Sequence, residues 1–162
     1  MEKVDKFIFK VLCWACAALM FSMMALIFTQ VIARYVFNNS LTWSEEVGRY
    51  IFVWMSFLGL AAVYYKGSHI SLNFLLDKLS GPYKKSLRIF IDSLTIFLSC
   101  VIIMGGYRLV ELGMRQRSAA LRLPMHMVYI VLPISGILLL YFALRRFYAT
   151  ARSGTSSGGT AP

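Results

Sequence analysis

The chain has 162 residues, 59% of them hydrophobic, and its mean hydropathy is +0.67. Soluble globular domains have nearer half of their residues apolar, so this excess indicates a membrane protein. The formal net charge of +10 would suit a nucleic-acid-binding protein, but here the basic residues lie between long apolar runs. Basic residues in that position set membrane topology and contact phospholipids, so we expect lipid and no nucleic acid as a partner.

The first two apolar runs predict two transmembrane helices. Residues 11–32 carry no charge, and roughly 22 residues are enough to cross a hydrocarbon core of about 30 Å. This run is longer than the apolar part of a signal peptide, so we expect a retained helix. The second run, 50–65, follows Thr42-Trp43-Ser44-Glu45, which fits a capping box and predicts a helix start near Thr42.

Two further runs complete the membrane domain. Residues 89–107 contain only one charge, Asp92, and residues 123–144 contain Pro133, where neighbouring helices would tolerate a kink. We therefore predict an all-α integral membrane protein with a single four-helix domain over residues 1–150. Its helices are expected near 7–33, 43–65, 83–110 and 124–147.

The remaining segments have their own patterns. Residues 70–79 carry apolar side chains on one helical face and polar ones on the other, and they are too few to span a membrane. We expect a short amphipathic helix there, lying in the membrane interface between helices 2 and 3. Residues 151–162 are mostly Ser, Gly and Thr and predict a flexible cytoplasmic tail.

The distribution of basic residues predicts the orientation. Four spans place both termini on one side, and that side, with the middle loop, holds eleven of the 17 basic residues and every lysine. The positive-inside rule then places both termini in the cytoplasm. Six arginines lie on the opposite side and oppose this trend: Arg34, Arg49, Arg108, Arg115, Arg117 and Arg122.

The polar residues within the spans argue against several functions. No ionisable residue is expected near the bilayer midplane, with Asp92 about one turn inside its helix, which disfavours an autonomous ion-coupled pump. His69 and His126 should lie at opposite membrane surfaces, too far apart to share a haem in an electron-transfer subunit. The cysteines at positions 13, 16 and 100 lie inside apolar runs, where we expect buried, inert thiols. No cofactor or metal is expected.

Two charged clusters leave alternatives open. Glu45 and Glu46 are spaced to pair with Arg49 on one helix, or they contact Arg34 or another membrane subunit. The arginines at 115, 117 and 122 contact lipid headgroups or an acidic surface on a periplasmic partner. Trp43 and Trp54 are expected to anchor the helix at the interface or to pack between helices.

Several segments, in their order and spacing over residues 7–147, resemble the small membrane subunit of TRAP (tripartite ATP-independent periplasmic) transporters. One residue departs from the resemblance, since Arg122 stands where a small residue, often glycine, is expected. The segments are Arg34-Tyr35-Val-Phe, Trp43-Ser-Glu-Glu46-Val-Gly-Arg49-Tyr50, Phe52-Val-Trp54, Gly59, His69-Ile-Ser71-Leu, Ala120-Leu-Arg-Leu-Pro124-Met and Tyr129-Ile-Val-Leu-Pro133.

The resemblance implies a bacterial inner-membrane importer with three components and no enzyme activity. In that family a periplasmic substrate-binding protein captures an organic acid, such as a C4-dicarboxylate or sialic acid. The large permease subunit carries the acid inward by a sodium-driven, elevator-type motion. The small subunit pairs with the large one as a scaffold and helps to dock the binding protein. The alternative is a self-sufficient small transporter that works as a homo-oligomer.

The resemblance and the residue patterns together give the candidate sites. Small-residue faces at Gly59-Leu-Ala61-Ala62 and Gly105-Gly106 suit packing either against the large subunit or within the four-helix domain. The candidate periplasmic docking residues are Arg115, Arg117 and Arg122. The candidate subunit-interface or structural residues are Arg34, Tyr35, Trp43, Glu45, Glu46, Arg49, Tyr50, Trp54, Gly59 and His69.

Overall fold

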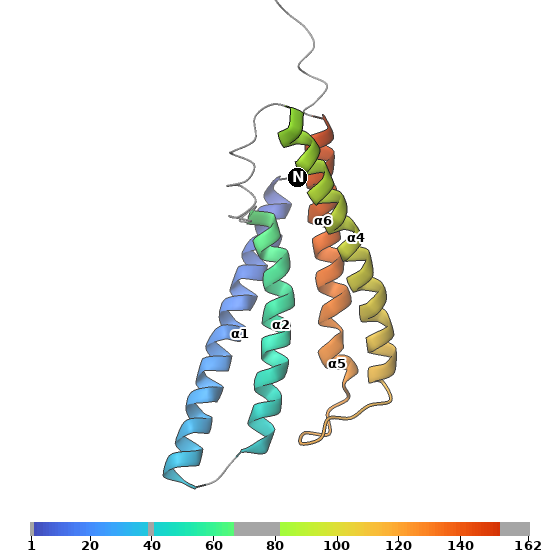
Figure 1. Cartoon of the computed structure of the whole chain (residues 1–162). Coiled ribbons are helices and arrows are strands. Elements are labelled where there is room, and N and C mark those ends of the chain that lie inside the picture. Colours follow the sequence, from blue (N-terminus) through green and yellow to red (C-terminus); the bar gives the residue numbers. More distant parts are fainter. Residues whose placement is uncertain (1, 39–40, 67–81, 153–162) are drawn as a thin grey trace, which may run out of the picture.

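The computed structural model describes residues 2–38, 41–66 and 82–152, so the predicted interfacial segment 70–79 and residues 153–162 lie outside it. Four stretches are long and apolar enough to cross a membrane, which confirms the predicted all-α, four-helix membrane fold. The elements are α1 (Glu2–Val36), α2 (Thr42–Lys66), α4 (Pro82–Gly113), α5 (His126–Tyr129) and α6 (Val131–Arg152), as Figure 1 shows.

The start of α2 differs from the predicted capping box. The helix begins at Thr42, but among the described residues no hydrogen bond joins Thr42 to Glu45. Instead the hydroxyl of Ser44 donates to the carbonyl of Leu41 at 2.6 Å, and the Ser44 amide donates to the same oxygen at 3.1 Å. The capping-box prediction was therefore wrong, and the first-turn carboxylates remain available for contacts outside the helix.

The last span is broken near Pro133, as the proline led us to expect. Proline has no N–H to donate, and its ring collides with the carbonyl four residues earlier in a regular helix, which here is that of Tyr129. Accordingly, α5 ends at Tyr129 and α6 begins at Val131, with a turn at Ile130 between them.

The four long helices pack as a row. α1 contacts α2, α2 contacts α6, and α6 contacts α4, so α1 and α4 form the two edges of the row (Figure 1). Both chain ends lie at the same end of the row, which we call the terminal end. The connection between α4 and α5, residues 114–125, lies at the opposite end, which we call the loop end.

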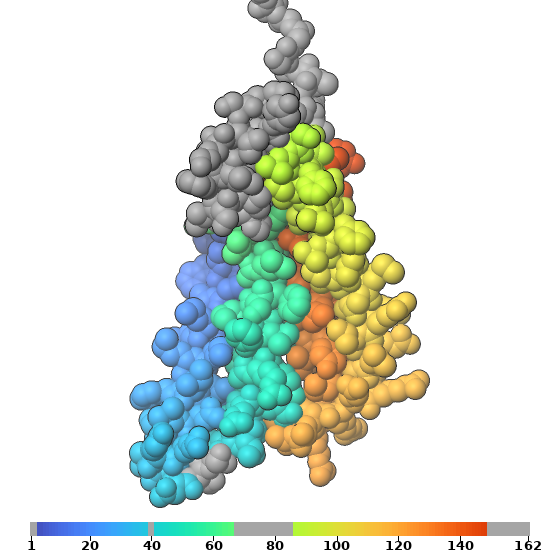
Figure 2. Space-filling view, in the orientation of Figure 1, coloured from blue at the N-terminus to red at the C-terminus, as the bar shows by residue number. Residues whose placement is uncertain are grey.

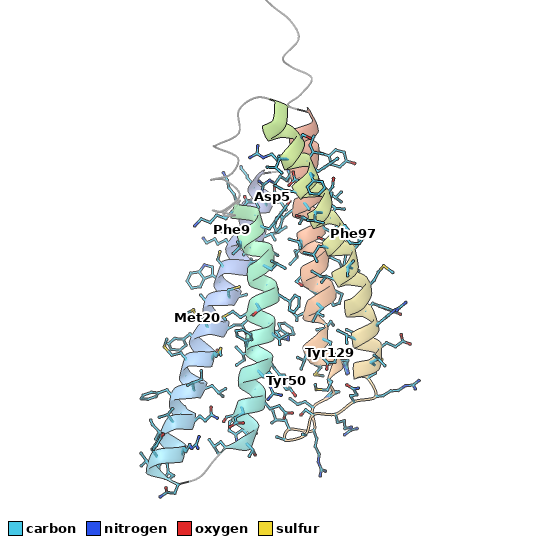
Figure 3. All side chains as sticks on the ribbon, in the orientation of Figure 1. Asp5, Phe9, Met20, Tyr50, Phe97 and Tyr129 are labelled. Carbon is cyan, nitrogen blue, oxygen red and sulfur yellow. The ribbon has the colours of Figure 1, made fainter. Side chains whose placement is uncertain are left out.

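The core lies toward the terminal end, where α1, α2 and α6 meet. The rings of Phe9, Tyr65 and Phe142 join these three helices, with successive centroids 4.9 Å and 5.1 Å apart. Elsewhere the two edge helices project large apolar side chains outward, including Met20 on α1 and Phe97 on α4 (Figure 2; Figure 3). The buried core residues are Leu12, Ala61, Ala62, Tyr64, Leu139, Phe142 and Ala143.

The closest approach between α4 and α6 depends on glycine. A Cβ atom at Gly106 would lie 2.8 Å from Cδ of Pro133, and one at Gly136 would lie 2.7 Å from Cγ1 of Ile103. By contrast, a Cβ at Gly59 or Gly105 would meet nothing within 4 Å. The Gly105-Gly106 face is thus divided, with Gly106 packing inside the row and Gly105 on an open surface.

This division gives a matched pair of variants. Gly106→Ala is expected to lower the free energy of unfolding by about 1–3 kcal/mol, because the added methyl overpacks the α4–α6 contact. Gly105→Ala, one residue earlier, should cost nothing, because the added methyl meets no neighbouring atom and alanine favours a helix. Thermal unfolding of both variants in one detergent measures the difference, and equal midpoints would contradict the close contact.

Candidate docking and subunit interfaces

At the loop end, Glu46 of α2 holds the segment that connects α4 to α5. Its Oε2 accepts hydrogen bonds from the Ser118 hydroxyl at 3.0 Å and from the N–H groups of Ala120 and Leu121 at 3.2 Å and 3.0 Å. Its Oε1 accepts another from the N–H of Ala119 at 3.1 Å. Bonds to an ionised acceptor are stronger than neutral ones, and successive amides in a turn suit an anion. One carboxylate therefore fixes this loop to α2.

The loop itself folds back as a narrow hairpin. The Ser118 amide donates to the Leu123 carbonyl at 2.9 Å, and the Met125 amide donates to the Gln116 carbonyl at 3.1 Å. At the tip, Arg122 has φ +53°, in the left-handed region that glycine adopts without strain. This conformation is a physical reason for the small residue expected there, and an arginine at this position adopts it at an energetic cost.

Three exposed arginines surround the Glu46 contact. Arg115 lies at the base of the loop, while Arg117 and Arg122 belong to the hairpin. None of the three lies within ion-pair distance of an acidic side chain among the residues that the structure describes. The loop therefore presents positive charge outward, while its only carboxylate contact, to Glu46, is made through Ser118 and backbone amides.

The first turns of α2 do not form the predicted local ion pairs. Within the described ranges, neither Glu45 nor Glu46 reaches Arg49, because Glu46 turns toward the loop and Glu45 faces α1. The side chain of Glu45 lines a cleft of about 280 Å³ between the two helices. The other residues of that cleft are Gln30, Val31, Arg34 and Tyr35.

The other subunit-interface candidates are spread along α2. The hydroxyl of Tyr50 donates to Sδ of Met125 at 3.4 Å, so Tyr50 supports the same loop as Glu46. Trp43 is exposed at the loop end, Trp54 is half-buried, and Gly59 borders open space. His69 lies outside the described residues. The structure thus groups Glu46 with Tyr50 beneath the loop, and Arg34 with Tyr35 and Glu45 around the cleft.

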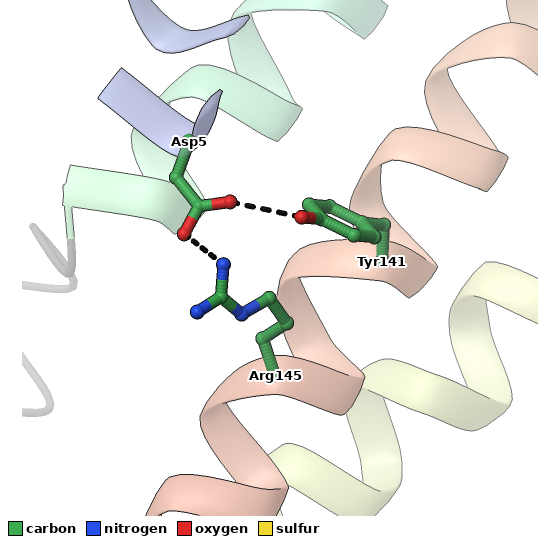
Figure 4. Close-up of polar contacts among 3 residues, drawn as sticks. All are labelled: Asp5, Tyr141 and Arg145. Carbon is green, nitrogen blue, oxygen red and sulfur yellow. Dashed lines mark hydrogen bonds and ion pairs between the residues drawn. The ribbon is translucent and has the colours of Figure 1, made fainter. Parts of the chain in front are cut away.

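The terminal end holds two buried carboxylates that the sequence did not connect to partners. Asp5 of α1 accepts a hydrogen bond from the Tyr141 hydroxyl at 2.9 Å and pairs with the Arg145 guanidinium, both on α6 (Figure 4). These contacts tie the first helix to the last. An acid in the first helix and a basic pair at the end of the last one were the available sequence signal.

The second carboxylate, Asp92, joins three helices. It is 1% exposed and accepts a hydrogen bond from the Tyr64 hydroxyl of α2 at 3.0 Å. Nε of Arg146 on α6 lies 3.6 Å from the same oxygen, and its guanidinium carbon lies 5.6 Å from the Tyr64 ring centroid. Asp92 lies about 15 Å along α4 from Pro82, at about 1.5 Å per residue, so the expected single turn was too shallow.

Neither histidines nor cysteines form an evident reactive site. Among the described residues, no three His, Cys, Asp or Glu side chains gather as they would around a metal ion. The three cysteines are free thiols, and two of them, Cys13 and Cys100, are exposed on the helix surface. Our expectation that these two are buried was wrong, because both lie on the edge helices.

Comparison with known proteins identifies the family. A family model described as the DctQ component of tripartite ATP-independent periplasmic transporters matches residues 23–153. The chain belongs to this family. A TRAP transporter small permease protein of Haemophilus influenzae is 30% identical over 151 residues, which cover 93% of each chain. The sialic acid TRAP transporter small permease protein SiaQ of Vibrio cholerae is 25% identical over 130 residues, covering 80% of this chain and 75% of SiaQ.

A longer relative shows how the small permease region relates to the rest of a permease. The sialic acid TRAP transporter permease protein SiaT of Haemophilus influenzae is 23% identical over 151 residues. That match covers 93% of this chain but only 24% of SiaT, so in that relative the small permease region is one part of a longer permease. The TRAP small permease described here is thus a transporter component and a multi-pass protein of the bacterial inner membrane.

The Glu46 contact can be tested without any partner. Glu46→Ala removes the acceptor of three loop amides, so hydrogen exchange at residues 119–121 is expected to accelerate on the order of tenfold or more. Trypsin cleavage after Arg117 and Arg122 should accelerate with it. Glu45→Ala is the matched control, because Glu45 accepts no hydrogen bond from the loop. Equal exchange in the two variants would show that Glu46 does not hold the loop.

Proposed function

We propose that this TRAP small permease is the static membrane subunit of a sodium-driven organic acid importer. It pairs with the large permease subunit and helps to dock the periplasmic substrate-binding protein. The observation that carries this proposal is the arginine-bearing loop fixed to α2 by Glu46. The cargo is an organic acid such as a C4-dicarboxylate or sialic acid, and its contacts lie on the other two components.

The charge distribution along the helices supports a scaffold role. Residues 11–33 of α1, 50–65 of α2, 93–107 of α4 and 127–144 of α6 contain no Asp, Glu, Lys or Arg. A membrane carrier usually places ionisable side chains along its substrate or ion path. These spans offer apolar surface for lipid and for another membrane protein, and the large subunit supplies the path.

The proposed orientation places the terminal end in the cytoplasm and the loop end in the periplasm. Eleven of the 17 basic residues then face the cytoplasm or its interface, in agreement with the positive-inside rule. Arg115, Arg117 and Arg122 oppose that rule, so a periplasmic role would account for their presence. An acidic surface on the binding protein fits their charge, and such complementarity speeds encounter and fixes the docked orientation.

Charge reversal on the loop tests docking. The double substitution Arg115→Glu and Arg117→Glu is expected to weaken binding of the fluorescently labelled binding protein to the membrane complex in nanodiscs by about tenfold or more. The wild-type affinity should also fall as salt is raised, because exposed charges are screened. The change removes positive charge from the periplasmic side, so topology is not expected to invert.

The matched control keeps the charge. Arg115→Lys with Arg117→Lys should bind the labelled protein with nearly wild-type affinity, because the docking attraction is electrostatic. Unchanged affinity of the charge-reversed complex at low salt would reject the loop as the docking site.

A further inference from the structure

The edge helix α1 carries an aromatic ring at every seventh position along its whole length. These rings, which we call the aromatic ladder, are between 65% and 77% exposed. None of them belongs to the buried core, and α1 packs mainly on one neighbour, α2. The ladder consists of Phe7, Trp14, Phe21, Phe28 and Tyr35.

A seven-residue repeat indicates packing against another helix. Lipid chains impose no period on the side chains that they surround, whereas a partner helix that winds left-handedly meets the same face every 3.5 residues. The ladder keeps this period over 28 residues, about 42 Å at 1.5 Å per residue, which exceeds the hydrocarbon thickness. Small residues at Ala18 and Ala25, four positions after a ring, leave room for a partner's side chains between the rings.

An apolar groove runs beside the ladder toward the loop end. It has a volume of about 420 Å³ and lies between α1 and α2. Methionine dominates its lining, and flexible thioether side chains adapt their shape to an inserted partner. The lining residues are Met20, Met23, Met24, Ile27, Phe28, Val31 and Met55.

The indole of Trp14 distinguishes a protein partner from lipid. Trp14 lies about 8 Å along α1 from the helix middle, well inside a hydrocarbon half-thickness of about 15 Å. It is 69% exposed, and no described residue accepts a hydrogen bond from its N–H. A polar N–H left in hydrocarbon is costly, and tryptophan in contact with lipid prefers the interface. A helix of another protein can offer the missing acceptor.

The opposite edge lacks this feature. The exposed stripe of α4 is formed by Phe90, Leu94, Phe97, Val101 and Met104, and it contains no hydrogen-bond donor. Such a surface is satisfied by lipid alone. At the loop end of α1, by contrast, the ladder finishes at Tyr35 in the polar cleft with Arg34 and Glu45, which could hold the end of a partner helix.

We propose that the aromatic ladder of α1 packs against a transmembrane helix of the large permease subunit, and that the exposed stripe of α4 faces lipid. This assignment rests on the proposed function and names the surface through which the two membrane subunits pair. The period of the rings sets a left-handed crossing, the methionine groove accepts the partner's side chains, and Trp14 donates to an acceptor on the partner helix.

Capture of the co-expressed large permease by affinity-tagged variants tests the assignment. Phe21→Ala with Phe28→Ala is expected to reduce captured large permease at least tenfold relative to wild type. Phe90→Ala with Phe97→Ala is the matched control on α4, removing two equally exposed rings, and capture should stay within about twofold. Trp14→Phe keeps the ring but removes the N–H, and an intermediate loss is expected.

Photocrosslinking avoids any effect of truncation on folding. Benzoylphenylalanine at position 21 should crosslink to the large permease, and at position 97 it should not. Crosslinks to the large permease from position 97 alone, crosslinks from position 21 to a second copy of this chain, or equal capture by both double variants would overturn the assignment. Failure of the wild-type chain to capture the large permease would overturn the proposed function itself, and the two failures are thereby distinguished.

Discussion

The hydrocarbon of a bilayer offers no partner to a polar group, and this constraint organises the molecule. Its buried carboxylates lie toward the two ends of the row, and each is met by donors from another helix or loop. At the terminal end Asp5 joins α1 to α6, and Asp92 joins α4 to α2 and α6. At the loop end Glu46 joins α2 to the connection between α4 and α5. The row is thus fastened at both ends and apolar between them.

A row exposes more surface than a closed bundle with the same helices. Its two edges, α1 and α4, are flanked by long helix neighbours on one side only, so wide apolar faces remain for lipid or for another membrane protein. A frame for a moving permease needs these properties, because the fixed subunit must contact its partner broadly and resist displacement. The family assignment and the apolar middle of each helix agree with such a frame.

The sequence was sufficient for the elements and insufficient for the pairings. Four uninterrupted apolar runs specify four spans, because length and hydropathy alone decide whether a helix can cross a bilayer. The proline at 133 marked the break before α6. The expected glycine at 122 pointed to a special backbone conformation, and Arg122 indeed has a positive φ. Each of these features is encoded within a few residues of chain.

Contacts between distant segments were not readable in the same way. Glu46 had an apparent partner four residues or fewer away, yet it bonds to residues 118–121, because the folded loop offers three amides and a hydroxyl together. Asp92 was placed too near the surface, since only the packing of α2 and α6 on α4 creates its polar surroundings. The insertion of α6 between α2 and α4 likewise depends on close packing at Gly106 and Gly136.

The most direct test of the account is reconstitution of purified components into vesicles. Vesicles would contain this chain alone, the large permease alone, or both, with an inward sodium gradient and the binding protein loaded with a labelled organic acid. The account expects vesicles with this chain alone to take up no more label than empty ones, and the pair to import it. Uptake by this chain alone would contradict the claim that it frames transport and leaves the carrying to its partner.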